Sequence, residues 1–100
     1  MMPIKVSVVE DDDEVRQSLM VLINGSEGYT CVSSHRSAED AILGIPARPP
    51  EVVLMDINLP RQSGIECVQQ LKAQLPELQF LMLTMYEDTD LIFKSLAAGA

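Results

Sequence analysis

Four short, mostly apolar runs, separated by stretches with helical periodicity, constrain the fold of this chain more than any other feature. The runs are rich in β-branched residues and lack a regular apolar-polar alternation, which is typical of strands buried on both faces. They cover residues 4–9, 29–33, 52–55 and 80–83. Buried strands that alternate with helices form a parallel sheet covered by helices on both faces. The sequence therefore predicts an α/β fold built as a doubly wound parallel sheet.

Each predicted strand is followed by residues that favour a helix. The first helix begins at an N-cap, either Asp12 or Asp13, and carries an apolar stripe at helical spacing. The stripe consists of Val15, Leu19, Leu22 and Ile23. The run Ser37-Ala38-Glu39-Asp40 has the form of a capping box and predicts a second helix. A third stripe covers residues 65–75, and a last helix is predicted to begin near Asp88 or Thr89.

Composition and charge limit the classes of function that the chain can have. One hundred residues fit one domain, and a net charge of −8 disfavours direct binding to nucleic acid, because phosphate contacts require clustered Lys and Arg. No apolar run approaches the length of a membrane span and the N-terminus lacks the pattern of a signal peptide, so a cytoplasmic protein without membrane contact is expected. The two cysteines, Cys31 and Cys67, are expected to be buried reduced thiols.

Polar residues stand at the ends of three predicted strands, where packing gives no reason for them. Glu10 and Asp11 follow the first strand, Asp56 follows the third, and Thr84 follows the fourth. The carboxyl ends of neighbouring parallel strands form the ligand site in open α/β sheets. Carboxylates about 4 Å apart repel by about 4 kcal/mol per pair at an effective dielectric near 20, so a cation is needed. Mg²⁺ prefers such oxygen ligands, whereas zinc is disfavoured because the sequence has no cluster of Cys and His.

Asp56 is the carboxylate best placed to react, because it ends a strand and is followed by a loop. A carboxylate can attack phosphorus and form an aspartyl phosphate when a metal neutralises the phosphoryl oxygens. Thr84 can donate its hydroxyl to such a group. The sequence contains neither of the common glycine-rich nucleotide-binding motifs. The phosphoryl donor is therefore expected to be another protein or a small phosphodonor.

These residues resemble the receiver domain of two-component response regulators along the whole chain. The matching motifs, in order, are Val8-Val9-Glu10-Asp11-Asp12, Leu54-Met55-Asp56-Ile57-Asn58-Leu59-Pro60, Ser63-Gly64, Leu83-Thr84 and Ala97-Ala98-Gly99-Ala100. The run Leu83-Thr84-Met85-Tyr86-Glu87-Asp88 resembles especially the regulators with a LuxR-type helix-turn-helix output domain. The resemblance implies a flavodoxin-like (βα)5 fold and a phosphoacceptor signalling domain rather than an enzyme. It also implies a role in transcription regulation for the parent protein.

The resemblance further implies a role for each residue of the acidic pocket. Asp56 would be the phosphoacceptor. Glu10 and Asp11 would form the acidic pair that holds Mg²⁺, together with Asp56 and the backbone carbonyl of Asn58. A shifted acidic pair, Asp11 with Asp12, is the alternative.

Residues after the fourth strand are implied to control the output. Thr84 would move towards the phosphoryl group, so that phosphorylation biases a two-state element at the fourth strand and helix. Met85 would restrict access to the phosphoryl pocket, and Tyr86 stands at a position that tunes dephosphorylation. A histidine kinase or a small phosphodonor would supply the phosphoryl group, and a DNA-binding output domain of the parent protein would respond.

Family members continue past the segment that corresponds to Ala97–Ala100 into a fifth strand and a fifth helix. The fifth strand carries a lysine and an aromatic residue that take part in the switch. Residues 1–100 are therefore expected to form one truncated receiver domain that lacks this strand and helix, with the output domain outside the chain. The fourth strand would then be an apolar edge through which chains self-associate.

Two alternatives follow from the same residues. A pseudo-receiver would act as an interaction surface without phosphorylation, and an aspartyl-phosphate phosphohydrolase would turn over phosphate esters. The second class usually has Asp-x-Asp at its first strand, whereas Glu10 and Asp11 are adjacent. Simpler roles are expected for three other residues: Asp13 and Glu14 lie at a solvated helix start, and His35, which follows the second strand, lies on the surface.

Overall fold

The computed structural model describes residues 2–57, 59 and 64–83, in which strands and helices alternate strictly. The elements are β1 (Ile4–Val9), α1 (Asp13–Asn24), β2 (Tyr29–His35), α2 (Ala38–Gly44), β3 (Val52–Asp56), α3 (Gly64–Gln74) and β4 (Gln79–Leu83). The predicted strands and helices in this part of the chain are confirmed, with boundaries that differ by about two residues at most. The helix predicted near Asp88 lies outside the described residues.

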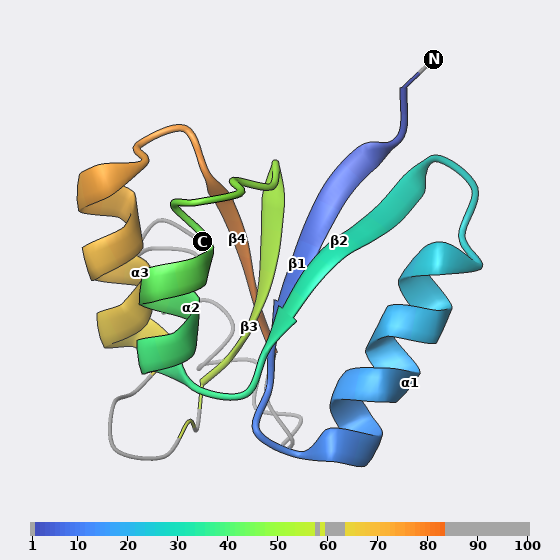
Figure 1. Ribbon diagram of the computed structural model, residues 1–100, viewed down its shortest axis with the longest axis horizontal. Helices are drawn as coiled ribbons and strands as arrows, with labels where there is room; N and C mark the ends of the chain where they lie inside the picture. The colour runs from blue at the N-terminus through green and yellow to red at the C-terminus, as the bar shows by residue number, and fades with distance from the viewer. Residues whose placement is uncertain (1, 58, 60–63, 84–100) are drawn as a thin grey trace.

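The strands form one parallel sheet in the order β2-β1-β3-β4 (Figure 1). This order confirms the flavodoxin-like arrangement that the resemblance implied. The chain moves outward from β1 to β2, and then returns past β1 to place β3 on its other side. The strand order therefore reverses between β1 and β3, which is where ligands bind in sheets of this kind.

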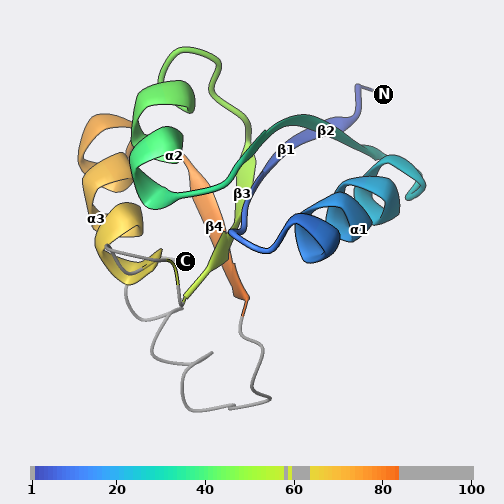
Figure 2. The same cartoon turned by 60° about the horizontal axis from the view of Figure 1, so that its bottom comes forward.

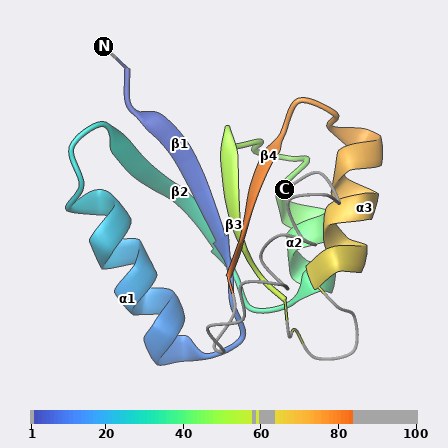
Figure 3. The ribbon, with the colours of Figure 1, turned by 180° about the vertical axis from the view of Figure 1, so that it is seen from behind.

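Helices cover both faces of the sheet. Helix α1 lies on one face, and α2 and α3 lie side by side on the other, as the views from the front and from behind agree (Figures 1 and 3). The tilted view separates the two layers (Figure 2). The larger apolar cluster lies between the sheet and the α2–α3 layer, whereas Val6, Val8 and Ile23 form a smaller one beneath α1. The doubly wound architecture is thus confirmed.

Side chains cap the first two helices as the sequence predicted. Asp12 is the N-cap of α1, and its carboxylate accepts a hydrogen bond from the Val15 amide at 3.1 Å. Ser37 is the N-cap of α2, and its hydroxyl accepts from the Asp40 amide at 3.1 Å. Each contact satisfies a backbone N–H that has no partner inside the helix.

The buried face of α1 differs from the predicted stripe. Arg16 is buried, whereas Leu22 is 66% exposed. The Arg16 guanidinium donates to the Glu10 carbonyl at 3.1 Å and pairs with Asp13, so the cation is satisfied where it lies. Arg16 and Ile23 are seven positions apart and therefore lie on the same side of the helix, which is the side that faces the sheet. Leu22 is one position from Ile23 and so points about 100° away from that side. The prediction for Leu22 was therefore wrong.

Strand β2 extends to His35 and contains an irregularity. Val6 pairs with Cys31, but the next residue, Ser7, pairs with Ser33, so the register skips Val32 as in a β-bulge. His35 is the last residue of the strand and is only 7% exposed. Its predicted surface position was wrong, because the strand continues beyond residue 33 and α2 covers the ring.

Both cysteines are free, with Cys67 fully buried and Cys31 half-buried. Among the described residues, none of the helices is long and apolar enough to cross a membrane. Strand β4 pairs with β3 along its length. Self-association through β4 stays a prediction.

Candidate metal and phosphoacceptor site

The acidic site forms where β1 and β3 end side by side. Val9 pairs with Met55, so the residues that follow them leave the sheet at the same edge. Glu10 comes directly after β1, and Asp56 is the last residue of β3. The parallel register therefore brings together carboxylates that are 46 positions apart in the sequence.

Glu10, Asp11 and Asp56 offer ligand oxygens that all lie within 4.8 Å of one another. Glu10 and Asp56 are each only 4% exposed, whereas Asp11 is open to solvent. One face of the cluster is thus accessible and the other is closed by the protein. Within the described residues, the structure brings together the three carboxylates that the sequence predicted.

The electrostatics of the cluster show most clearly at Glu10. Burial raises the pKa of its carboxyl from 4.5 to about 8, and hydrogen bonds with Asp56 and Asp11 contribute in the same direction. The Asp12 amide donates to Glu10 Oε2 at 3.2 Å and opposes part of this effect. Without a cation, the Glu10 carboxyl therefore retains a proton that a free carboxyl would lose near neutral pH.

The backbone of Glu10 is fixed from two sides. Its N–H donates to the His35 carbonyl at 3.0 Å, and its carbonyl accepts from Arg16 Nη1 at 3.1 Å. The first contact comes from β2 and the second from α1. Glu10 is thus held both by β2, which pairs with β1, and by α1, which follows β1 in the sequence.

The backbone beyond Asp56 is fixed by the start of α3. The Gly64 amide donates to the Ile57 carbonyl at 3.0 Å, and the side chains of Ile57 and Leu59 are buried in the larger core. A Cβ at position 64 would lie only 2.0 Å from the Asp56 carbonyl oxygen. This approach requires glycine at position 64, which was named from the sequence only as part of the Ser63-Gly64 motif.

Asp12 has a different role from its acidic neighbours. Its carboxylate is exposed and caps α1, whereas the carboxylates that gather at the strand ends are those of Glu10, Asp11 and Asp56. The geometry therefore favours the pair Glu10 and Asp11 over the shifted pair. Four other predicted site residues, Asn58, Thr84, Met85 and Tyr86, lie outside the described residues.

The donor set fits Mg²⁺. Among the described residues, it consists of three carboxylates, two of them buried and one exposed to solvent. Mg²⁺ typically binds one or two carboxylates and keeps several waters. A divalent cation would also stabilise the ionised form of Glu10, which burial disfavours. The site thus meets the chemical requirement of the ion that the sequence predicted.

A hydrogen-bonded chain of side chains lies beside the acidic site and was missed by the sequence reasoning. His35 Nδ1 lies 3.1 Å from Asp40 Oδ2, His35 Nε2 lies 3.1 Å from Ser33 Oγ, and Ser33 Oγ lies 2.6 Å from Ser7 Oγ. Ser7 is fully buried in the middle of β1. A serine among the buried apolar residues of β1 was the signal that could have revealed this chain.

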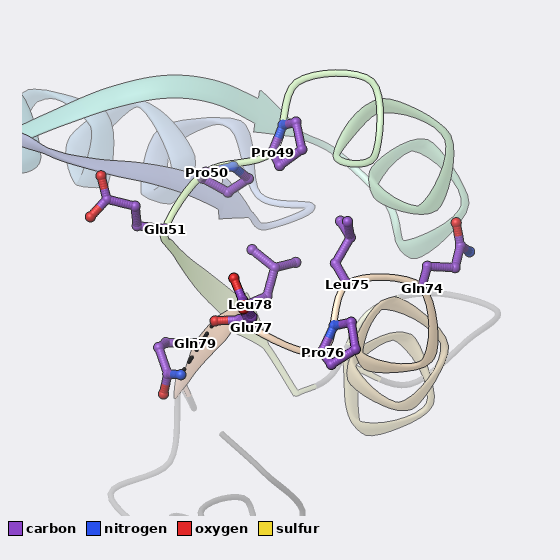
Figure 4. A pocket seen from close by; sticks show the side chains of 9 residues that line it. All are labelled: Pro49, Pro50, Glu51, Gln74, Leu75, Pro76, Glu77, Leu78 and Gln79. Atoms are coloured by element: carbon purple, nitrogen blue, oxygen red, sulfur yellow. Dashed lines mark hydrogen bonds between the residues drawn. The ribbon is translucent and has the colours of Figure 1, made fainter.

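A groove at the opposite end of the sheet is separate from the acidic site (Figure 4). It lies where β3 and β4 begin, between the segments that precede the two strands. Its lining consists of Pro49, Pro50, Glu51, Gln74, Leu75, Pro76, Glu77, Leu78 and Gln79. The Gln79 amide side chain donates to the Glu77 carbonyl across its rim at 3.4 Å. The groove contains none of the predicted site residues.

Comparison with known proteins agrees with this geometry. The family model for the response regulator receiver domain matches residues 6–100. The chain belongs to this family. The resemblance found in the sequence is thereby confirmed, and the acidic strand ends belong to a receiver domain of the two-component systems.

The receiver domain is also similar to individual regulators. The transcriptional regulatory protein LnrK of Bacillus subtilis is 33% identical over 97 residues, which are 97% of this chain and 44% of that protein. The DNA-binding transcriptional activator DevR/DosR of Mycobacterium tuberculosis is 32% identical over 97% of this chain and 45% of its own length. The chain thus spans less than half of these relatives.

A solved structure supports the same assignment. The crystal structure of a LuxR-family two-component response regulator from Aurantimonas sp. SI85-9A1 superposes with a TM-score of 0.90 and is 28% identical. The match covers 98% of this chain and 70% of that chain. The similarity to LuxR-type regulators that residues 83–88 suggested therefore holds for the receiver domain as a whole.

Proposed function

We propose that this receiver domain accepts a phosphoryl group on Asp56, in a reaction that depends on Mg²⁺. The main support is that Glu10, Asp11 and Asp56 come together where the strand order reverses, with ligand oxygens within 4.8 Å of one another. The backbone carbonyl of Asn58 is proposed as a further ligand. The domain would act as a signalling component, and its phosphoryl donor would be a histidine kinase or a small phosphodonor.

The chemistry follows from what each residue can do. An oxygen of the Asp56 carboxylate would form a bond to phosphorus, while the bond between phosphorus and the donor breaks and its electron pair leaves with the donor. Mg²⁺, when bound, would neutralise the phosphoryl oxygens as they approach the acidic cluster. Glu10 and Asp11 would hold the ion, and the Gly64 contact would keep the backbone of Asp56 in place.

The output is proposed to be transcription control by a DNA-binding domain of the parent protein. This proposal is supported by the names of the relatives, which are a transcriptional regulatory protein and a DNA-binding transcriptional activator. Thr84 would act as the switch hydroxyl that responds to the phosphoryl group. Met85 and Tyr86 would tune access to the site and the lifetime of the phosphorylated state.

Phosphorylation can be tested with acetyl phosphate and Mg²⁺, followed by intact-mass measurement. We expect the mass of one phosphoryl group to be added to the wild-type chain and to be absent in Asp56→Asn. Asp12→Asn is the matched control, because asparagine caps a helix as well as aspartate and the site keeps its three carboxylates. This control should be phosphorylated like the wild type, and omission of Mg²⁺ should abolish the signal.

The same experiment distinguishes the alternatives. If neither the chain nor its full-length parent gains a phosphoryl group, the pseudo-receiver interpretation replaces the proposal. Continuous release of phosphate from phosphate esters by the isolated chain would instead identify a phosphohydrolase. A phosphoryl group that survives Asp56→Asn would show that another residue is the acceptor.

A further inference from the structure

The chain of side chains from Ser7 to Asp40 connects three elements next to the metal site. Ser7 lies on β1, Ser33 and His35 lie on β2, and Asp40 lies in the first turn of α2. An ionised Asp40 can only accept, so His35 Nδ1 donates to it, while His35 Nε2 is hydrogen-bonded to the Ser33 hydroxyl and this hydroxyl to that of Ser7. Every link is 3.1 Å or shorter. The serines and the histidine therefore satisfy one another in an apolar layer.

The position of this chain coincides with the β-bulge. Cys31 packs in the cluster beneath α1, whereas His35, further along the same strand, contacts α2. Ser33 and His35 bond each other on the α2 side, although residues 31, 33 and 35 of a regular strand would share one face. Because the register skips Val32, the residues after it point to the opposite face of the sheet from the one expected in a regular strand. Ser7 and Ser33, whose hydroxyls are hydrogen-bonded, are the first pair after the skipped residue. Because a slip of one residue turns every later side chain to the other face, the polar chain is formed only in the bulged register.

The bulged register also determines what holds Glu10. It pairs Val9 with His35, so that the His35 carbonyl accepts the Glu10 N–H at 3.0 Å. The His35 ring is fixed on its other side by α2, where a Cβ on Gly44 would come within 2.6 Å of Cε1. The ring thus has little freedom to move without moving the strand end.

We propose that the chain Ser7–Ser33–His35–Asp40 locks the bulged register of β2 and thereby positions Glu10 for Mg²⁺. His35 is then a positioning residue of the metal site, which it never touches with its side chain. The inference rests on the proposed Mg²⁺ function of Glu10. It adds that the affinity for the ion depends on a polar chain that runs from β1 through β2 to α2 and contains none of the three carboxylates.

The first test measures Mg²⁺ affinity by calorimetric titration of Mg²⁺ into the wild-type 100-residue chain and into three variants. His35→Leu replaces the ring by an apolar side chain of similar size and removes both of its hydrogen bonds. It should weaken Mg²⁺ binding about tenfold, which is typical for the loss of a residue that orients a metal ligand. His35→Gln places an amide near the Nε2 position and should recover most of that loss. Ser33→Ala removes only the central link and serves if His35→Leu fails to fold.

Ile23→Val is the matched control for general destabilisation. Ile23 lies in the core beneath α1, on the opposite face from the polar chain. We expect it to lower the melting temperature without changing Mg²⁺ affinity. Equal affinities in the wild type, His35→Leu and Ser33→Ala would overturn the inference, and so would a loss in Ile23→Val as large as in His35→Leu.

A second readout separates this inference from the proposed function. Hydrogen exchange of the Glu10 amide reports the bond to the His35 carbonyl without any metal. Exchange should be faster in His35→Leu and Ser33→Ala than in Ile23→Val, and unchanged exchange would overturn the role of the polar chain. If the wild-type chain binds no Mg²⁺ at all, the metal function itself is refuted, whatever the amide shows.

Discussion

Substitution of Gly64 by alanine tests how rigidly the fold must hold the proposed phosphoacceptor. The added Cβ would lie 2.0 Å from the Asp56 carbonyl oxygen, about 1.4 Å inside ordinary contact at 3.4 Å, and 3.0 Å from Ile57 Cα. Because both obstacles are backbone, relief requires the start of α3 and the end of β3 to separate by about 1 Å. Overpacking of this kind costs about 1–3 kcal/mol of the free energy of unfolding. A displacement of about 1 Å in a reacting group can slow its chemistry about a hundredfold.

Gly25→Ala provides the matched control for this prediction. Gly25 has a φ of −83° and its Cβ would lie 3.2 Å from the Val21 carbonyl oxygen, so alanine requires only a small adjustment there. Urea unfolding should show a change of about 1 kcal/mol or less for this control, because the smaller backbone entropy of alanine in the unfolded chain offsets the tight contact. Phosphorylation by acetyl phosphate, followed by intact mass over time, should be slow only in Gly64→Ala. If Gly64→Ala reacts at the wild-type rate, or if both variants are slowed equally, the contact does not position Asp56.

Two further predictions concern titrating groups. Because burial raises the pKa of Glu10 to about 8, Mg²⁺ must displace a proton, so Mg²⁺ affinity should increase with pH up to about 8 and then level off. In the metal-free chain the protonated form of Glu10 favours folding; this contribution is complete below pH 4.5 and is lost as the pH rises through about 8. Calorimetry in buffers of different ionisation enthalpy should detect the released proton, and Glu10→Gln should abolish its release; a pH-independent affinity in the wild type would contradict this reasoning. Burial also raises the pKa of the Cys67 thiol to about 11. Iodoacetamide at pH 8 should therefore modify Cys67 only as the chain unfolds. Alkylation of Cys67 in the native chain at the rate of a free thiol would show that the thiol is accessible and contradict this prediction.

The strands and helices were predictable because each has a strong local signal. Apolar runs end abruptly in Glu10 and Asp56, and side-chain caps at Asp12 and Ser37 mark helix starts. The parallel register that unites the carboxylates then follows from the alternation of strands and helices. The acidic half of the site was therefore visible in the sequence before any coordinates.

The rest depends on tertiary contacts that local patterns do not encode. The bulge at Val32 reverses the face of β2, so a regular strand pattern could not place His35. Arg16 is buried because a strand end offers it the Glu10 carbonyl, and this contact displaces Leu22 from the inner face of α1. Glycine is needed at position 64 because the backbone of Asp56, in the preceding strand, comes close to it in space, and no local sequence pattern shows this approach.

The unequal cores on the two faces of the sheet have a consequence for how the molecule opens. Among the described residues, fourteen buried side chains form the cluster that faces α2 and α3, whereas three form the one beneath α1. Elements with little buried apolar contact separate locally at a lower free energy than the whole fold. Helix α1 is therefore the element that we expect to detach first, and with it the Arg16 contact to Glu10. One of the two backbone restraints on Glu10 would then be transient on the timescale of local opening, while the restraint from His35 lasts as long as the sheet itself.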